Sequence, residues 1–147
     1  MEIVKYILLS DGIWENIGGH VREKEEYKPD DTWLYVIGVV NGSPIGLVLV
    51  HKTEEGHDQC HVQILPEHRK EQGKEFGIKG MKWIWDNTDI ERLVASIPAI
   101  YPNVRRYAEM QGFQVFRTLE KSYKKDDIMH DRWLMAVRRE EWAQQTI

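Results

Sequence analysis

The sequence has a single cysteine, and this scarcity excludes several classes of protein. Cys60 has no second cysteine with which to form an internal disulfide. Its neighbour His61 does not belong to a zinc-type spacing of cysteines and histidines, so we expect no metal cofactor. A reducing compartment fits this composition, and we expect a cytoplasmic protein.

The chain also lacks a basic excess and a long apolar run. It has 20 Lys and Arg against 24 Asp and Glu, with a net charge of -4, so we expect no nucleic-acid partner. No apolar run is long enough to span a bilayer, and we expect no membrane association. The amino end carries Glu2 and lacks a small-residue cleavage site, which argues against a signal peptide.

The sequence contains no low-complexity linker, no internal repeat and no Walker or dinucleotide motif. Its 147 residues are 41% hydrophobic and 30% charged, which suits one globular domain with a sizeable core. We therefore predict a single domain over residues 1–147.

Short runs rich in β-branched and aromatic residues predict strands, and Asn41-Gly42 predicts a tight hairpin turn. The predicted strands cover residues 2–9, 32–40, 45–51, 59–65, 92–97, 113–123 and 132–137. Helical spacing predicts one or two short helices within residues 11–26 and a helix over 102–111 that Gly112 closes.

The stretch ILPEHRKEQGKEFGIKGMKWIW, residues 64–85, joins a strand to a helix through a charged turn. Helical spacing brings Phe76, Gly80, Trp83 and Ile84 to one face of this helix. A helix between the fourth and fifth strands implies a parallel crossover. The fold class is therefore α/β: a mixed, mostly antiparallel sheet of six to seven strands flanked by about four helices.

This order of elements resembles the GNAT superfamily of acetyl-coenzyme A-dependent N-acetyltransferases over nearly the whole chain. Two local motifs carry the resemblance. One is the strand–loop–helix at residues 64–85, and the other is NVRRYAEMQGF, residues 103–113, a helix led by asparagine and ending in Gly-Phe. The resemblance implies a GNAT-like fold, with acetyl-coenzyme A as co-substrate and a diverged, phage-like member as one reading.

The first motif implies a site for the pyrophosphate of coenzyme A, because the N–H groups at a helix start and the helix dipole favour anions. Gly73 fills the central glycine position, whereas Lys70 stands where the family has Gln or Arg, and Glu75 where it has Gly or Ala. A solvated helix start is the alternative. The expected cofactor-binding residues are Ile64, Leu65, Arg69, Lys70, Glu71, Gln72, Gly73, Lys74 and Asn103.

The second motif implies a proton donor for the leaving sulfur four residues before Gly112, but Ala108 occupies that position. We expect Tyr107 in the core, and we name Tyr101 and Tyr123 as substitute acids. The carbonyl of the thioester needs hydrogen-bond donors, which we expect to be backbone N–H groups near residues 63–65. Loss of a positioned acid slows such a reaction without forbidding it, since a thiolate is a tolerable leaving group.

For the general base we name His61, because a neutral imidazole accepts a proton near physiological pH. The alternative is that His61 lies on a partly solvated sheet face. His51 and His57 flank a hairpin turn, and we expect both to be solvated. Acidic residues gather early in the chain and favour a cationic acceptor or a charged, solvated surface: Glu23, Glu25, Glu26, Asp30 and Asp31.

Two functions remain open. The first is an N-acetyltransferase in which a small-molecule or lysine-type primary amine attacks the thioester directly. The second is a catalytically degenerate GNAT-fold protein that binds a protein partner, for example as a phage assembly or accessory module. The sequence also leaves a homodimer open.

Overall fold

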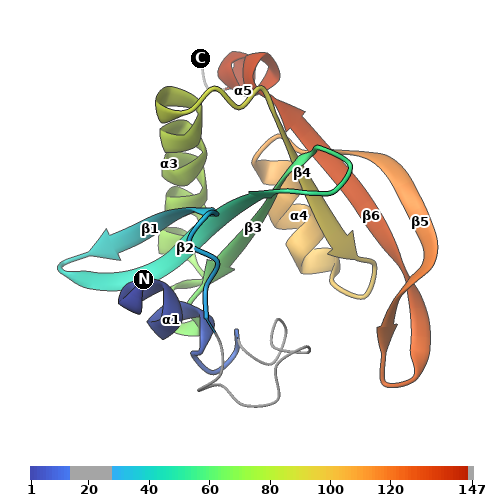
Figure 1. Ribbon diagram of the computed structural model, residues 1–147, viewed down its shortest axis with the longest axis horizontal. Helices are drawn as coiled ribbons and strands as arrows, with labels where there is room; N and C mark the ends of the chain where they lie inside the picture. Colours follow the sequence, from blue (N-terminus) through green and yellow to red (C-terminus); the bar gives the residue numbers. More distant parts are fainter. Residues whose placement is uncertain (14–27, 146–147) are drawn as a thin grey trace. The chain divides into compact units, whose positions relative to one another are not determined.

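The computed structural model describes residues 1–13 and 28–145, and these residues form two compact units (Figure 1). Unit 1 combines residues 1–51 and 61–86, and unit 2 combines residues 52–60 with the chain from Asn87 onward. Hydrogen-bonded neighbours among the described strands follow the order β1-β2-β3-β4-β6-β5. The β3–β4 pairing is parallel, at Gln59 and Val94, whereas β4–β6 and β5–β6 are antiparallel. The predicted fold class is confirmed: a mixed sheet combined with helices.

Unit 1 contains α1 (Glu2–Leu8), β1 (Leu34–Val40), β2 (Ser43–Lys52), a 3-10 turn η2 (Pro66–His68) and α3 (Glu71–Asn87) almost entirely. The strand β3 (Asp58–Ile64) contributes its second half. The predicted hairpin turn is confirmed, because Val40 pairs with Ser43 across a two-residue loop. Asn41 and Gly42 have φ values of 51° and 81°, as this kind of turn requires.

Unit 2 contains β4 (Arg92–Pro98), α4 (Pro102–Met110), β5 (Gln114–Lys125), β6 (Ile128–Arg138) and α5 (Arg139–Gln145). The sequence prediction includes every one of these except α5. Gly112, with a φ of 94°, ends α4 as predicted. Arg139 fixes the start of α5 by donating to the carbonyls of Thr88 and Ile90, both at 2.7 Å.

The first predicted strand, residues 2–9, is wrong, because this segment forms the helix α1. Val4, Ile7 and Leu8 are buried in one cluster with Ile13, Leu47, Leu49 and Leu65. Their spacing of three and one suits a helix face, whereas a strand would have put Tyr6 on the same face as Val4 and Leu8. Tyr6 is instead 59% exposed. The helices expected within residues 11–26 lie mostly outside the described residues.

The helix α3 packs through small residues on the strands of unit 1. A Cβ atom at Gly80 would stand 3.1 Å from Cγ2 of Val48, and one at Gly38 would stand 2.6 Å from the ring of Phe76. The absence of side chains at Gly80 and Gly38 therefore permits close packing of this helix on the strands. The predicted apolar face holds for Phe76, Gly80 and Ile84, but Trp83 is exposed, since it lies one position before the buried row.

The buried face of α1 gives a direct test of the helix. We expect Ile7→Ala to lower the free energy of unfolding by about 2–5 kcal/mol, because it opens a cavity in the unit 1 core. The control Tyr6→Ala removes a larger but exposed side chain, and we expect a change within about 0.5 kcal/mol. Urea denaturation followed by circular dichroism measures both. Equal losses in the two variants would contradict a helix with this orientation.

Candidate active site

The junction between β3 and α3 has the order of strand, turn and helix that the sequence predicted. The strand ends at Ile64, η2 follows, and α3 begins at Glu71. The first helical backbone bond is donated by the N–H of Lys74 to the carbonyl of Lys70, at 3.2 Å. The N–H groups before Lys74 therefore belong to the first turn, where a helix has no acceptor of its own to offer. The side chains of Lys70 and Lys74 are exposed beside this turn.

Arg69 has contacts within unit 1, and its expected contact with phosphate stays a prediction. Its Nε donates to the carbonyl of Ile64 and its Nη2 donates to the carbonyl of Gly12, both at 2.9 Å. The guanidinium thus joins the end of β3 to the segment after α1. This use of two donors makes Arg69 a structural tie within unit 1.

Gly73 is tightly packed. It is buried, and a Cβ atom there would stand 3.1 Å from the carbonyl oxygen of His68 and 3.2 Å from Cδ1 of Ile64. The glycine therefore lets the start of α3 approach the chain that precedes it. We expected it to let a phosphate approach the backbone, but the space on the Cβ side holds the His68 carbonyl.

Leu65 corrects one expectation about the thioester. Its N–H donates to the carbonyl of Ile45 at 2.9 Å, so this donor is occupied within unit 1. The side chain of Leu65 is buried in the unit 1 core. The role of a hydrogen-bond donor to the thioester carbonyl therefore does not fit Leu65 in this structure.

The acidic side chains at the start of α3 are matched by lysines. Glu71 lies 3.9 Å from Nζ of Lys74, and Glu75 lies 2.8 Å from Nζ of Lys79. The hydrogen bond from Lys79 lowers the pKa of Glu75. Gln72 contacts Nδ1 of His68 through its Oε1 atom, which ties the first turn of the helix to η2. The carboxylates thus have cationic neighbours.

His61 lies on β3 and forms a pair with His51 on β2. The two Nε2 atoms are 3.2 Å apart and the ring planes differ by 6°, so one imidazole donates and the other accepts. The indole of Trp33 stacks on His51 with the ring centroids 4.6 Å apart. The expectation that His51 is a solvated turn residue is wrong, because it is half-buried and holds a specific partner.

Burial lowers the pKa of His61 to about 4, and the neighbouring His51 adds to this effect. His61 is therefore neutral at physiological pH, as the role of a base requires. Its low pKa also makes an isolated imidazolium at this position unfavourable. A proton that His61 accepts is therefore more stable on a neighbouring group. Nε2 of His51 lies within hydrogen-bond distance of Nε2 of His61 and can receive it.

Tyr101 and Tyr123 meet in unit 2, with their ring centroids 6.4 Å apart in an edge-on contact. Nζ of Lys125 donates to the hydroxyl of Tyr101 at 2.9 Å. This hydrogen bond lowers the pKa of Tyr101, whereas the hydrogen bond with Tyr101 raises the pKa of Tyr123. The structure therefore brings the two substitute acids together and adds Lys125, which sequence reasoning missed.

The second motif occupies α4. Ala108, at the position of the family's acid, is buried, and Asn103 is exposed in the first turn of the helix. Tyr107 is half-buried, and burial raises the pKa of its phenol to about 12. Tyr107 is thus a weak proton donor, in keeping with the packing role expected for it.

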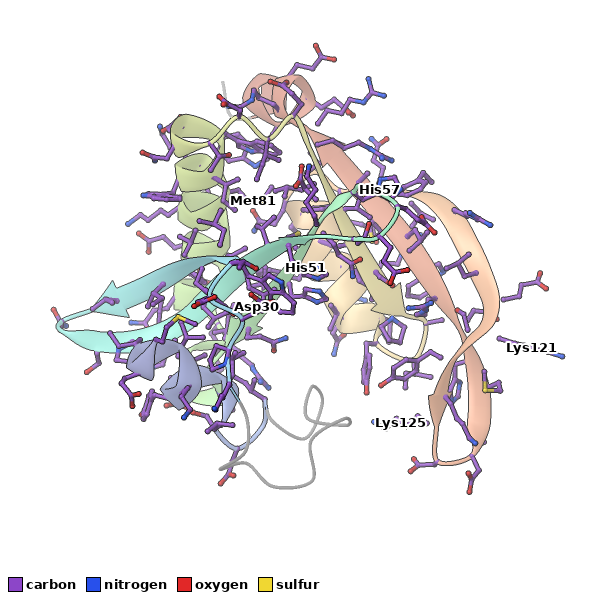
Figure 2. All side chains as sticks on the ribbon, in the orientation of Figure 1. Asp30, His51, His57, Met81, Lys121 and Lys125 are labelled. Atoms are coloured by element: carbon purple, nitrogen blue, oxygen red, sulfur yellow. The ribbon has the colours of Figure 1, made fainter. Side chains whose placement is uncertain are left out.

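Among the early acidic residues, Asp30 and Asp31 are exposed. Hydrogen bonds from Thr32 lower the pKa of Asp30. Figure 2 labels Asp30 and His51, both in unit 1. Glu23, Glu25 and Glu26 lie outside the described residues.

Two further searches concern metals and membranes. Within residues 1–13 and 28–145, no three or more His, Cys, Asp or Glu side chains come together in a way that could hold a metal ion. None of the helices in the described part of the chain is both long and apolar enough to cross a membrane.

Cys60 is buried, and burial raises the pKa of its thiol to about 12, which disfavours a nucleophilic thiolate.

Comparison with known families settles where the sequence belongs. A family model described as "Protein of unknown function (DUF2824)" matches residues 8–146. The chain belongs to the DUF2824 family. No curated protein matches the sequence.

Solved structures share the fold of this DUF2824 chain. A chimera of the spermidine N-acetyltransferase SpeG from Vibrio cholerae and hSSAT superposes with a TM-score of 0.77 at 12% identity, covering 97% of this chain and 92% of the other. SpeG from Vibrio cholerae in complex with CoA and spermine gives 0.68 at 15% identity, covering 90% and 77%. A GNAT-family acetyltransferase from Bacillus anthracis gives 0.61 at 18% identity, covering 73% and 66%. The fold is therefore the GNAT fold.

The histidine pair predicts a pH dependence of stability. His61 has a lower pKa in the folded chain, about 4, than its ordinary value of 6.5. The unfolded chain therefore binds a proton first as the pH falls, and stability is lost between about pH 6.5 and 4 with a slope near 1.4 kcal/mol per pH unit. We expect His61→Gln to reduce this slope by about 1.4 kcal/mol per pH unit, the contribution of one proton. Urea denaturation across this pH range measures it.

The control for this prediction is Gln63→Ala, which changes a side chain that does not titrate on the same strand, β3, and should leave the slope unchanged. An unchanged slope in His61→Gln would contradict the buried, neutral state of His61.

Proposed function

We propose that this protein is an N-acetyltransferase that uses acetyl-coenzyme A and transfers the acetyl group to a primary amine by direct attack. The observation that carries the proposal is the junction of β3, η2 and α3 within a GNAT fold, where a helix of 17 residues begins beside exposed Lys70 and Lys74. The positive end of a helix dipole and basic side chains together favour a phosphate-bearing ligand. Coenzyme A supplies the acetyl group as a thioester, which is activated toward amines.

The chain offers groups that handle the two protons of the reaction. His61 is neutral at physiological pH and can take a proton from the attacking amine, with His51 as the group that receives it next. Tyr101 is the stronger acid of the two phenols because its pKa is lowered, so it can supply a proton to the leaving sulfur, with Tyr123 beside it to replace that proton. We assign these residues as base, relay and acids of the proposed reaction.

A cationic amine is the favoured acceptor. Among the similar structures, SpeG is a spermidine N-acetyltransferase, and one of its structures is a complex with CoA and spermine. In the present chain, exposed Asp30 and Asp31 precede Trp33, and such carboxylates attract an amine through long-range electrostatics. We propose polyamines and lysine-type amines as the classes to test first.

A second function is favoured by specific observations: a catalytically degenerate GNAT-fold protein that binds a protein partner, for example in phage particle assembly. The Leu65 N–H is occupied, Arg69 donates to two carbonyls, and Gly73 packs on the His68 carbonyl. Ala108 is buried where the family's acid would stand. These contacts account for the motif residues without any ligand.

Binding of the cofactor separates the two functions. We expect acetyl-coenzyme A to bind in isothermal titration calorimetry, and Lys70→Ala to weaken binding by about threefold to fivefold, because one exposed charge contributes modestly. Lys82→Ala is the matched control, since it removes a lysine from α3 about three helical turns away from Lys70. Absence of binding at millimolar acetyl-coenzyme A would remove the enzyme proposal and leave the binding module.

The proposed acids are tested by Tyr101→Phe and Tyr123→Phe, which keep the rings and remove the hydroxyls. With a polyamine acceptor, we expect substitution of the residue that protonates sulfur to lower kcat at least about tenfold with little change in KM. Positioned acids contribute about 10²–10⁴-fold to the rate. Tyr6→Phe removes an exposed hydroxyl on α1 and should leave kcat unchanged. Full activity in both test variants would exclude a phenol as the acid.

A further inference from the structure

The strand β1 stands at one end of the strand order, and β5 stands at the other. An edge strand exposes a row of backbone donors and acceptors that can pair with another chain, and proteins usually protect such edges with charges. The edge strand β5 follows this rule with charged residues along its length: Arg117, Glu120, Lys121, Lys124 and Lys125. The edge strand β1, with the sequence LYVIGVV, carries no charged residue.

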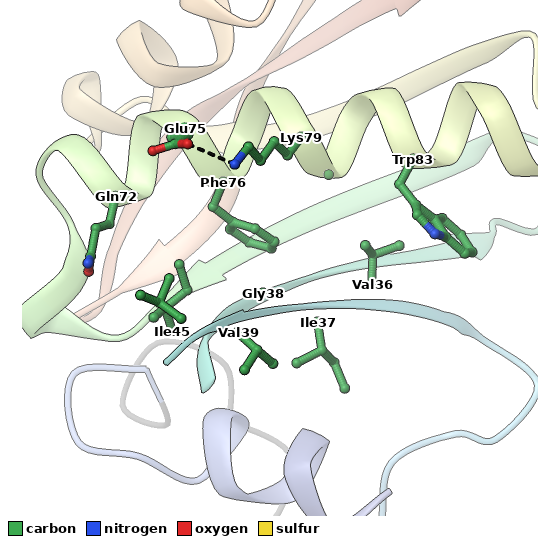
Figure 3. A pocket seen from close by; sticks show the side chains of 12 residues that line it. Val36, Ile37, Gly38, Val39, Ile45, Gln72, Glu75, Phe76, Lys79 and Trp83 are labelled. Carbon is green, nitrogen blue, oxygen red and sulfur yellow. Dashed lines mark ion pairs between the residues drawn. The ribbon is translucent and has the colours of Figure 1, made fainter. Parts of the chain in front are cut away.

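A groove of about 280 Å³ runs along this uncharged strand (Figure 3). On the strand side it is lined by every residue from Val36 to Val40. Side chains alternate between the two faces of a strand, so a groove lined by five successive residues follows the backbone edge and not one face. The opposite wall is α3, with Phe76, Gly80 and Trp83.

The groove is apolar at its centre and polar at its rim. Val39 is 54% exposed and Trp83 is 44% exposed. At the rim, Glu75 and Lys79 form an ion pair of 2.8 Å, drawn as a dashed line in Figure 3. An apolar centre with a polar rim is the usual anatomy of a protein interface.

We propose that this β1–α3 groove is the contact surface of a homodimer, in which β1 of a second copy adds to the edge of β1 in antiparallel orientation. A second copy fits the surface because it brings an equally uncharged strand and because the rim is self-complementary. Under two-fold symmetry, a rim that carries Glu75 and Lys79 one helical turn apart can meet each acid with a lysine. This inference is independent of the proposed enzymatic function.

The register of β1 limits the added pairing. A bulge interrupts the β1–β2 ladder between Gly38 and Val39, and bulges bend the strand that contains them. Regular pairing with a second copy is therefore confined to residues 34–38. Beyond the bulge, we expect Val39 to contribute through its side chain, in contact with the apolar surface around Trp83 of the other copy.

Sedimentation velocity tests the dimer on the full chain. We expect a monomer–dimer equilibrium between about 1 and 200 µM, a range that covers weak specific association. We expect Val39→Lys to raise the dimer dissociation constant at least about tenfold, because it buries a charge in the contact. The control Ile128→Lys introduces the same charge at an exposed apolar residue at the start of β6 and should leave the dissociation constant unchanged. A monomer throughout this range would overturn the proposal.

Amide hydrogen exchange locates the contact and guards against a folding artefact in the variant. In the unmodified protein, we expect exchange in residues 34–38 to slow as the concentration rises, while exchange in β5 stays constant. This dependence should vanish in Val39→Lys. A concentration dependence in β5 instead of β1, or a dimer with no change in either strand, would show that another surface mediates association and would overturn the proposal.

Discussion

The contact between Gly73 and the carbonyl of His68 is the constraint on which the candidate site depends. The absence of a Cβ atom lets the first turn of α3 approach η2 and the end of β3 at a distance that no other residue permits without a shift. Arg69 reinforces the same junction by binding the carbonyls of Ile64 and Gly12. Together these contacts fix where the helix begins and therefore where its first N–H groups point.

The same contacts involve two residues of the motif that could otherwise help to bind a phosphate. Glycine and arginine in the motif could serve a phosphate, yet here both have structural partners within unit 1. What remains for an anion is the helix start itself with the exposed lysines beside it, which is a weaker site than one with a bidentate arginine. The chain thus keeps the architecture of the GNAT fold, while the glycine and the arginine of its motif have structural partners within unit 1.

Each unit contains a pair of neighbouring titratable side chains in which the surroundings shift at least one pKa. In unit 1, His61 is kept neutral by burial and by His51. In unit 2, the Lys125 ammonium favours ionisation of Tyr101, while the contact with Tyr101 keeps Tyr123 protonated. Neighbouring titratable groups with shifted pKa values are candidates for proton transfer.

The sequence by itself determined the elements whose signals are local. The Asn41-Gly42 turn, the strands that flank it, the α3 helix and the Gly112 helix end all follow from residues a few positions apart, and the structure has them. The sequence misassigned residues 2–9, because a short apolar run satisfies both a strand and a helix, and only packing against Leu47 and Leu49 selects the helix.

The partners of the polar side chains were decided by tertiary structure alone. His51 and His61 are ten residues apart, Tyr101 and Lys125 are 24 apart, and Arg69 and Gly12 are 57 apart. No local pattern encodes contacts at such separations, because they arise only when strands pair and helices dock. For the same reason the uncharged sequence of β1 became informative only once the strand order placed it at an edge.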